Sequence, residues 1–176
     1  MVQKLVSNYG RHMKPKIPYL RIALTIVACI ALTVVVLLNV FTHVFSVVRY
    51  YGSGMEPALQ DRQVLLVLKT DQVEQGDIAA FYYNNKVLVR RVIAAGGTSL
   101  EISDAGVVTV DGMALAEDYV EDPTVGQCNI SFPYTVPYNS FFVMGDNRGI
   151  AMDSRLEEIG TIPRGRILGK VIFVFG

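Results

Sequence analysis

Cysteine and histidine are scarce in this sequence, which holds two of each among 176 residues. Cys29 falls inside a long apolar run and Cys128 far beyond it, so we expect no disulfide between them. We expect Cys128 to be a buried small side chain. His12 and His43 lie in the N-terminal part of the chain, away from Cys128, which predicts neither a zinc site nor a catalytic thiol. The residue types therefore indicate no metal ion and no cofactor.

Charged residues are missing from Ile22 to Val48, and the first part of this stretch is almost wholly aliphatic. A helix needs about 20 apolar residues to cross a hydrocarbon core ~30 Å thick. We therefore predict a transmembrane helix over residues 22–45. A buried core helix is the alternative, but it would show an amphipathic stripe, and none is visible.

Basic residues are distributed unequally on the two sides of this predicted span. Only Arg49 lies close behind it, and those in front of it are Lys4, Arg11, Lys14, Lys16 and Arg21. By the positive-inside tendency, residues 1–21 form a cytoplasmic basic tail and residues 46–176 an extracytoplasmic domain. The rival interpretation is a cleaved secretory signal. Asn39–Val48 offers no A-x-A-like cleavage site, which favours a retained, single-pass anchor in the cell membrane.

The formal net charge of zero hides a division between the two ends of the chain. Residues 46–176 carry all sixteen Asp and Glu but only eleven of the Lys and Arg, so the outer domain is acidic. An acidic domain argues against a nucleic-acid partner, because the phosphate backbone is itself negative.

Short apolar or alternating runs separated by turn residues follow Tyr50, without a long helical period. They lie at residues 64–68, 78–83, 87–94, 100–102, 107–110, 141–144 and 167–174. Asn84-Asn85, between two of these runs, predicts a tight hairpin turn because Asn tolerates positive φ. The pattern predicts a mainly β domain of antiparallel sheets or a coiled barrel, preceded by one transmembrane helix.

Three sequence blocks occur in a recognisable order. Residues 52–59 read Gly-Ser-Gly-Met-Glu-Pro-Ala-Leu, and residues 76–81 read Gly-Asp-Ile-Ala-Ala-Phe, followed by Leu-Val-Arg-Arg-Val-Ile at 88–93. Residues 142–148 read Phe-Val-Met-Gly-Asp-Asn-Arg, with Asp-Ser-Arg at 153–155. Together these blocks resemble those of type I signal peptidases, the membrane-anchored Ser/Lys endopeptidases that remove leader peptides from exported proteins. The resemblance covers the span and nearly the whole outer domain, and the compact length is similar to that of Gram-positive members.

In that family a serine attacks the scissile carbonyl, a lysine is the general base and a helper hydroxyl orients the lysine. The resemblance puts Gly54 at the nucleophile position, Arg90 at the base position and Ala151 at the helper position, and Ala58 stands where threonine is usual. Gly54 has no attacking atom. A lysine base needs its pKa to fall from ~10.4 to about 7, whereas the pKa of arginine starts well above that of lysine, so the group stays protonated. We therefore predict an inactive peptidase, in which Arg90 binds a carboxylate or backbone carbonyls.

Two nearby residues are fallback candidates for a catalytic pair. Ser53 is adjacent to Gly54, but neighbouring side chains on an extended strand point to opposite faces. Lys86 and Arg90 are an even number of residues apart, so their side chains would share one face of a regular strand. Lys86 nevertheless lies four residues away, over ~13 Å along the strand, at the predicted hairpin. An active site built on Ser53 and Lys86 therefore stays open as the less favoured alternative.

A set of charged residues matches the frame that the resemblance implies behind the catalytic centre. They are Arg91, Asp146, Arg148, Asp153 and Arg155. We predict that Arg91 pairs with Asp146 and that Asp153 pairs with Arg155. The plainer interpretation is a set of surface ion pairs that contribute ~0–1 kcal/mol each.

The leading hypothesis is a pseudoprotease that binds leader peptides or exported, pilin-like precursors by strand addition beside the membrane. The predicted peptide-binding residues are Ser53, Gly54, Met55, Pro57, Ile78 and Phe81. Family-level analogy extends to signal-peptidase-like proteins that lack catalytic residues and assist pilus assembly. Two alternatives stay open: an active type I signal peptidase, and a membrane-tethered structural β domain that binds no ligand.

Overall fold

The computed structural model describes residues 19–176, so most of the predicted basic tail, residues 1–18, lies outside the described residues. Helix α1 spans Tyr19–Val44, and its 26 residues have a mean hydropathy of 2.7 in their most apolar window. At 1.5 Å per residue the helix is about 39 Å long, enough to cross a membrane. The helix begins before residue 22 and ends before residue 45, because Phe45 already pairs with Leu68 in a strand. Among the described residues, 19–41 and 42–176 belong to two separate compact units.

The second unit is built from strands and one short 3-10 helix. The strands are β1 (Phe45–Arg49), β2 (Val64–Leu68), β3 (Ile78–Tyr83), β4 (Lys86–Ala95), β5 (Ser99–Ile102), β6 (Val108–Val110), β7 (Met113–Ala114), β8 (Tyr134–Thr135), β9 (Ser140–Met144), β10 (Ile162–Pro163) and β11 (Ile167–Phe175), and the 3-10 helix η1 is Arg164–Arg166. All seven runs expected from the sequence are strands. The sequence did not predict β1, β7, β8 and β10. Three of these have only two residues each, and the apolar sequence of β1 directly continues that of the helix.

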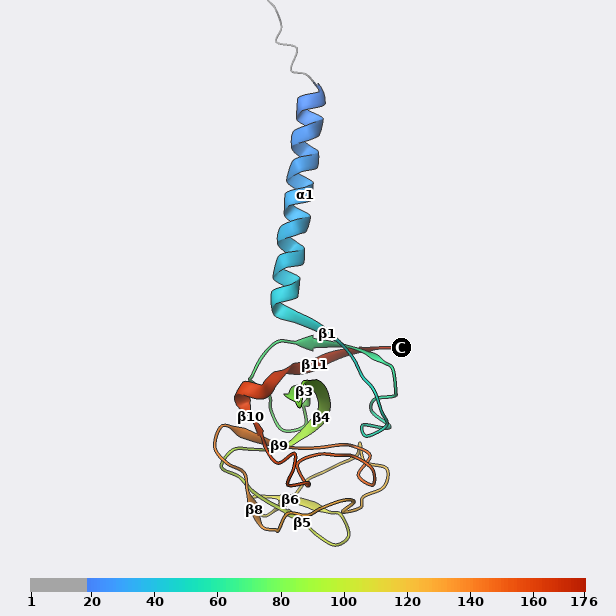
Figure 1. Cartoon of the computed structure of the whole chain (residues 1–176), viewed down its shortest axis with the longest axis vertical. Coiled ribbons are helices and arrows are strands. Elements are labelled where there is room, and N and C mark those ends of the chain that lie inside the picture. The colour runs from blue at the N-terminus through green and yellow to red at the C-terminus, as the bar shows by residue number, and fades with distance from the viewer. Residues whose placement is uncertain (1–18) are drawn as a thin grey trace, which may run out of the picture. The chain divides into compact units, whose positions relative to one another are not determined.

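The strands form two antiparallel sheets, which confirms the predicted fold class (Figure 1). The larger sheet has the order β1-β2-β11-β3-β4-β9-β10 and the smaller one the order β7-β6-β5-β8. Strand β11 is the central return strand, because it pairs with β2 on one side and β3 on the other. The larger sheet remains open, with β1 and β10 as its edges.

The predicted hairpin turn at Asn84-Asn85 is confirmed. Both residues have positive φ, 45° and 60°, and they connect the paired strands β3 and β4. Two positive φ angles in a two-residue loop define a turn whose twist suits a hairpin. Asp111-Gly112 forms a second turn of this kind between β6 and β7, with φ of 49° and 80°.

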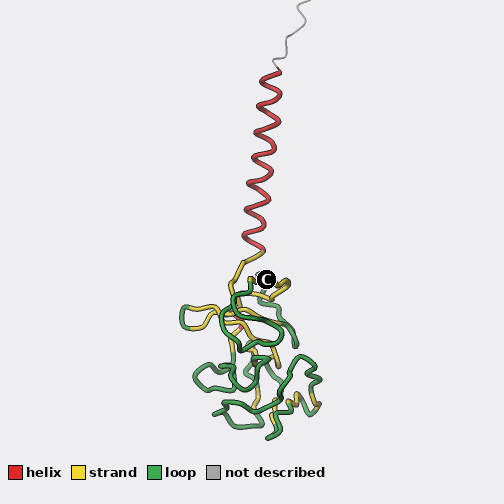
Figure 2. Tube along the Cα trace, turned by 90° about the vertical axis from the view of Figure 1, so that its right-hand side faces the viewer, coloured by secondary structure: helices red, strands yellow, loops and turns green. Residues whose placement is uncertain are grey.

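Three apolar clusters make up the core of the β unit. One lies among β3, β4, β9 and β10, a second between the larger and the smaller sheet, and a third between β2 and the turn after β1. Figure 2 shows how much of this unit is loop, so the buried strands carry most of the core. The expectation for Cys128 is wrong: its thiol is only partly buried and donates to the Ile130 carbonyl.

Candidate functional site

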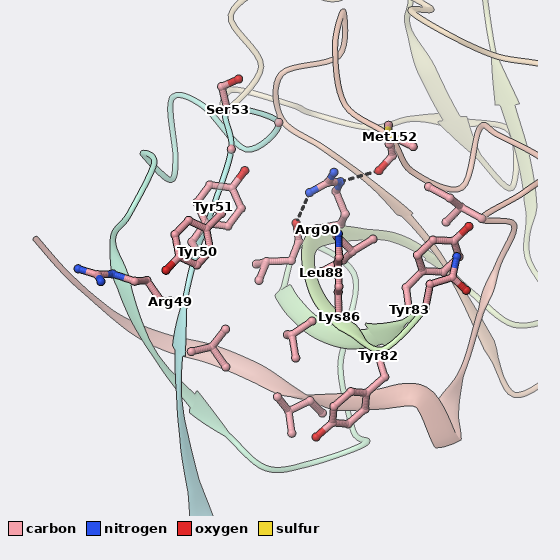
Figure 3. Close-up of a pocket in the computed structure, with 18 of the residues that line it drawn as sticks. Arg49, Tyr50, Tyr51, Ser53, Tyr82, Tyr83, Lys86, Leu88, Arg90 and Met152 are labelled. Carbon is pink, nitrogen blue, oxygen red and sulfur yellow. Dashed lines mark hydrogen bonds between the residues drawn. The ribbon is translucent and has the colours of Figure 1, made fainter.

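The β unit contains a groove of about 1090 Å³ that lies between two walls. One wall is β1 and the segment after it, up to Gly54, and the other is the first half of β4 with the β3–β4 hairpin. Figure 3 shows Tyr50 and Tyr51 on one side and Tyr82 and Tyr83 on the other, with Arg90 between them. Apolar and aromatic walls with few charges are typical of sites that take peptides or small molecules.

The wall formed by β4 has a free backbone edge. β4 pairs with β3 along Lys86–Arg91, but on its other side β9 pairs only from Arg91 onward. The carbonyl and the N–H of Val92 bond to Gly76 and Asp77, on the side of β4 where β3 lies. Because the direction of the backbone groups alternates along a strand, those of Arg90, Leu88 and Lys86 also point toward β3. The peptide groups of Val87 and Val89 therefore face the groove. A free strand edge of this kind can accept an added strand.

Gly54, Arg90 and Ala151 meet at one end of the groove. A Cβ placed on Gly54 would lie 3.3 Å from Arg90 Nη2 and 3.6 Å from Ala151 Cα. The three positions that the family resemblance assigned to nucleophile, base and helper are therefore neighbours in space. None of these three side chains offers a hydroxyl or an amine.

Arg90 is held in place by backbone carbonyls. Its Nε donates to the Met152 carbonyl at 2.9 Å, and its Nη1 donates to the Val89 carbonyl at 2.7 Å. The residue is 8% exposed. Burial lowers the pKa of the Arg90 guanidinium, an effect that neighbouring Tyr50 and Asp153 oppose. An arginine guanidinium is effectively always protonated in proteins, so the group remains a cation near neutral pH.

Tyr50 is a site residue that sequence reasoning missed. Its side chain is buried, and its hydroxyl accepts a hydrogen bond from the Met55 N–H at 3.0 Å. Burial raises the pKa of the Tyr50 phenol, against the attraction of Arg90. A tyrosine directly after β1 carries no local signal of this role, because the contact depends on how the next turn folds back.

The turn that carries Gly54 is fixed by the segment after β9. Asn147 donates its N–H to the Gly54 carbonyl at 3.1 Å, and Ala151 donates its N–H to the Asn147 carbonyl at 3.0 Å. Ser53 lies in a bend and Gly54 and Met55 lie in a turn, so these residues form no extended strand. The chain turns here because Met55 is drawn into the core beneath Tyr50.

The predicted pair of Asp153 and Arg155 is confirmed and is fully buried. Two guanidinium nitrogens of Arg155 donate to the carboxylate at 2.8 and 2.7 Å, and both side chains are 0% exposed. Asp153 also accepts from the Gly145 N–H at 2.9 Å, and Arg155 donates to the Val125 carbonyl at 2.6 Å. Through these hydrogen bonds the pair connects Gly145 to the loop that contains Val125. The alternative of an ordinary surface ion pair is excluded by this burial.

The predicted pair of Arg91 and Asp146 is also confirmed, with Nε to Oδ1 at 2.8 Å. Burial works to lower the pKa of Arg91, but the hydrogen bond and charge of Asp146 outweigh it, and the pKa is raised. The Arg91 guanidinium lies 3.9 Å from the centre of the Tyr119 ring. Arg148 pairs with Glu117, a partner that sequence reasoning missed because it lies 31 residues away.

The predicted peptide-binding residues divide into two groups. Ser53 and Gly54 line the groove. Met55 and Phe81 have 0% exposure and belong to the core, so in this structure they cannot contact a peptide. Pro57 is exposed and Ile78 is partly buried, but neither lines the groove. The edges of β3 are paired on both sides, by β11 and β4, so Ile78 and Phe81 do not present a free strand edge to a peptide.

The fallback pair of Ser53 and Lys86 is not assembled. Within residues 19–176 no hydrogen bond joins the two side chains, although both border the groove. In Figure 3 the Ser53 hydroxyl projects away from Arg90. Lys86 is exposed at the hairpin, as expected, so water surrounds its ammonium group.

Gly145 allows the closest approach in the site. A Cβ there would lie 2.3 Å from the Gly54 carbonyl oxygen and 2.3 Å from the Ala151 Cβ. Gly145→Ala will therefore push these segments apart and lower the free energy of unfolding by about 1–3 kcal/mol. Thermal denaturation of the full chain in detergent measures the effect. Gly165→Ala is the matched control, since nothing lies within 4 Å of its Cβ; equal stability of the two variants would contradict the prediction.

The family model described as signal peptidase, peptidase S26, matches residues 21–176 of the chain. A signal peptidase I of Bacillus licheniformis is 32% identical over 162 residues, covering 85% of this chain and 86% of that protein. Signal peptidase I T of Bacillus subtilis (strain 168) is 32% identical over 160 residues, covering 82% of each chain. A crystal structure of a signal peptidase I from Enterococcus faecalis V583 is 26% identical, covers 57% of this chain and 97% of that chain, and superposes with a TM-score of 0.49.

The chain belongs to the signal peptidase family. The family match starts inside α1 and runs through the whole β unit, so both the apolar helix and the groove fall within it. Membership in this family and the apolar helix support anchoring to a membrane.

Proposed function

We propose that this signal peptidase I-like protein binds extended segments of exported precursors in its groove and does not cleave them. The observation that carries the proposal is the meeting of Gly54, Arg90 and Ala151 at the end of the groove. Acyl transfer by an enzyme side chain needs a nucleophile within hydrogen-bond reach of a base. Here a glycine faces a permanently charged guanidinium, so neither half of that pair exists.

Peptide binding by strand addition is supported by the free edge at Val87 and Val89. An added strand would take main-chain hydrogen bonds from this edge, and the aromatic walls would cover its side chains. Arg90 already donates to the Val89 carbonyl, but a carbonyl oxygen has two lone pairs and can accept a second bond.

The membrane topology belongs to the same proposal. The basic residues near the N-terminus favour a cytoplasmic N-terminus, and residues 46–176 would then lie on the outer side, where exported chains emerge. Leader peptides are the first candidate ligands. Pilin-like precursors are the second, and they rest on family-level analogy alone.

The experiment is a titration of the full chain in detergent with a synthetic leader peptide that carries single N-methylated amides. Adjacent residues of a strand direct their amides to opposite sides, and the first half of β4 presents a free edge along Val87 and Val89, whereas the opposite wall turns where it approaches Arg90. Methylating the amides that face β4 will weaken binding about 5- to 10-fold each, and methylating the intervening amides will weaken it less.

Two results would count against the proposal. Affinity that does not change with any N-methyl group would exclude strand addition. Mass-spectrometric detection of a cleaved leader peptide, abolished by Ser53→Ala and unchanged by Gly54→Ala, would favour the active-enzyme alternative. Segments of a pilin precursor tested in the same titration check the second class of ligand.

A further inference from the structure

Arg90 is a buried cation that forms no ion pair among the described residues. The other arginines around the site, Arg91, Arg148 and Arg155, each pair with a carboxylate. Arg90 instead donates to the neutral carbonyls of Val89 and Met152, and the Tyr50 side chain also interacts with it. A guanidinium has five N–H donors, so these contacts leave part of its fork unused.

The groove in front of Arg90 has a charge opposite to that of the domain. Its lining includes Arg49, Lys86 and Arg90 but no Asp or Glu. Residues 46–176 as a whole carry sixteen acidic and eleven basic residues. Cations gathered in a cleft with apolar walls attract anionic ligands more strongly than the same charges on a flat surface.

The free edge of β4, to which a peptide strand would add, ends at Arg90. From Arg91 onward the same edge of β4 is taken by β9, through the pair Arg91 and Met144. The segment after β9 then turns over the site, with the Asn147 N–H bonded to the Gly54 carbonyl. A peptide lying along Val87 and Val89 in the direction of β4 therefore meets a closed end beside the guanidinium. Gly54, which carries no side chain, lies against the guanidinium at that end, since a Cβ there would be 3.3 Å from Arg90 Nη2.

We propose that the groove binds peptides that end in a free carboxylate, and that Arg90 receives this terminal carboxylate in a forked ion pair. The inference rests on the proposed function, because it requires an extended peptide on the β4 edge. Guanidinium and carboxylate match in a planar, two-bond geometry that lysine cannot reproduce. The ligand class is then a released, carboxylate-ended peptide, such as a leader already cut by an active peptidase, and not an intact precursor running through the site.

The test compares two synthetic leader peptides of the same sequence, ending in Ala-x-Ala, one with a C-terminal carboxylate and one with a C-terminal amide. The carboxylate peptide will bind the full chain in detergent at least about 10-fold more tightly, as charge-assisted hydrogen bonds require. Arg90→Gln will remove this preference, and Arg90→Lys will keep part of it. Arg49→Gln and Lys86→Gln are matched controls at exposed positions of the same groove and will change the ratio less than about 2-fold.

Each outcome has a distinct meaning. Equal affinities of the acid and the amide overturn the carboxylate site while leaving peptide binding intact. Binding of neither peptide overturns both the proposed function and this inference. A preference that disappears equally in Arg49→Gln and Arg90→Gln assigns it to the general charge of the groove and overturns the role of Arg90. The comparison on the unmodified chain needs no variant, so it stands even where Arg90→Gln fails to fold.

Discussion

The variant Gly54→Ser/Arg90→Lys will cleave a leader peptide slowly, whereas the unmodified chain and each single variant will not. Gly54→Ser alone provides a hydroxyl beside a guanidinium that cannot take its proton, and Arg90→Lys alone provides a base without a nucleophile. The two changes meet in space, since a Cβ on Gly54 lies 3.3 Å from Arg90 Nη2. The shorter lysine also relieves the crowding that a serine would meet from the guanidinium.

The triple variant that adds Ala151→Ser will be faster than the double variant by about 10-fold or more, within the range of positioned acid–base groups. The Ala151 Cα lies 3.6 Å from a Cβ on Gly54, so a hydroxyl there can orient the new lysine. Mass spectrometry of a leader peptide incubated with detergent-solubilised protein measures the cleavage. Gly54→Ala/Arg90→Lys/Ala151→Ser is the matched control, since it lacks only the attacking oxygen; cleavage by this control, or by the unmodified chain, would refute our view of the site.

The second large effect concerns the buried pair of Asp153 and Arg155. Asp153→Asn will lower the free energy of unfolding by about 3–5 kcal/mol, because it leaves the charge of Arg155 buried and uncompensated. For a domain of this size that corresponds to a fall in Tm of roughly 10–20 °C. The measurement is thermal denaturation of the full chain in one detergent at one scan rate.

The exposed pair of Arg62 and Asp61 is the control for this prediction. Their side chains are 79% and 48% exposed, so Arg62→Gln will change stability by about 0.5 kcal/mol or less. Combining Asp153→Asn with Arg155→Met will cost less than the sum of the single variants, since no lone charge remains. Additive effects, or an effect of Asp153→Asn as small as that of Arg62→Gln, would show that the pair does not support the site.

The difference between these two ion pairs explains why the family resemblance was needed to predict which charged residues support the site. Composition and spacing do not distinguish Asp153 from Asp61, since both sit next to or near an arginine in the chain. Only the tertiary structure separates a pair with 0% exposure from one at the surface. The sequence-based prediction was correct for Asp153 because a family motif carried the information that local chemistry lacks.

The sequence by itself determined what depends on near neighbours along the chain. Short apolar or alternating runs, separated by turn residues, specified seven of the eleven described strands, and Asn84-Asn85 specified a hairpin because it tolerates positive φ. It also specified the chemistry missing at Gly54, since no fold can give a glycine an attacking oxygen.

The tertiary structure decided what depends on pairing between distant segments. Met55 and Phe81 are buried and β4 carries the free edge, because β11 and β9 come from far along the chain to cover other edges. The same distant segments bring the carbonyl of Met152 to Arg90 and leave that cation facing a groove without acidic residues. Hydrophobic periodicity selects strands but not their partners, because the partner is set by which apolar faces pack together in the whole domain.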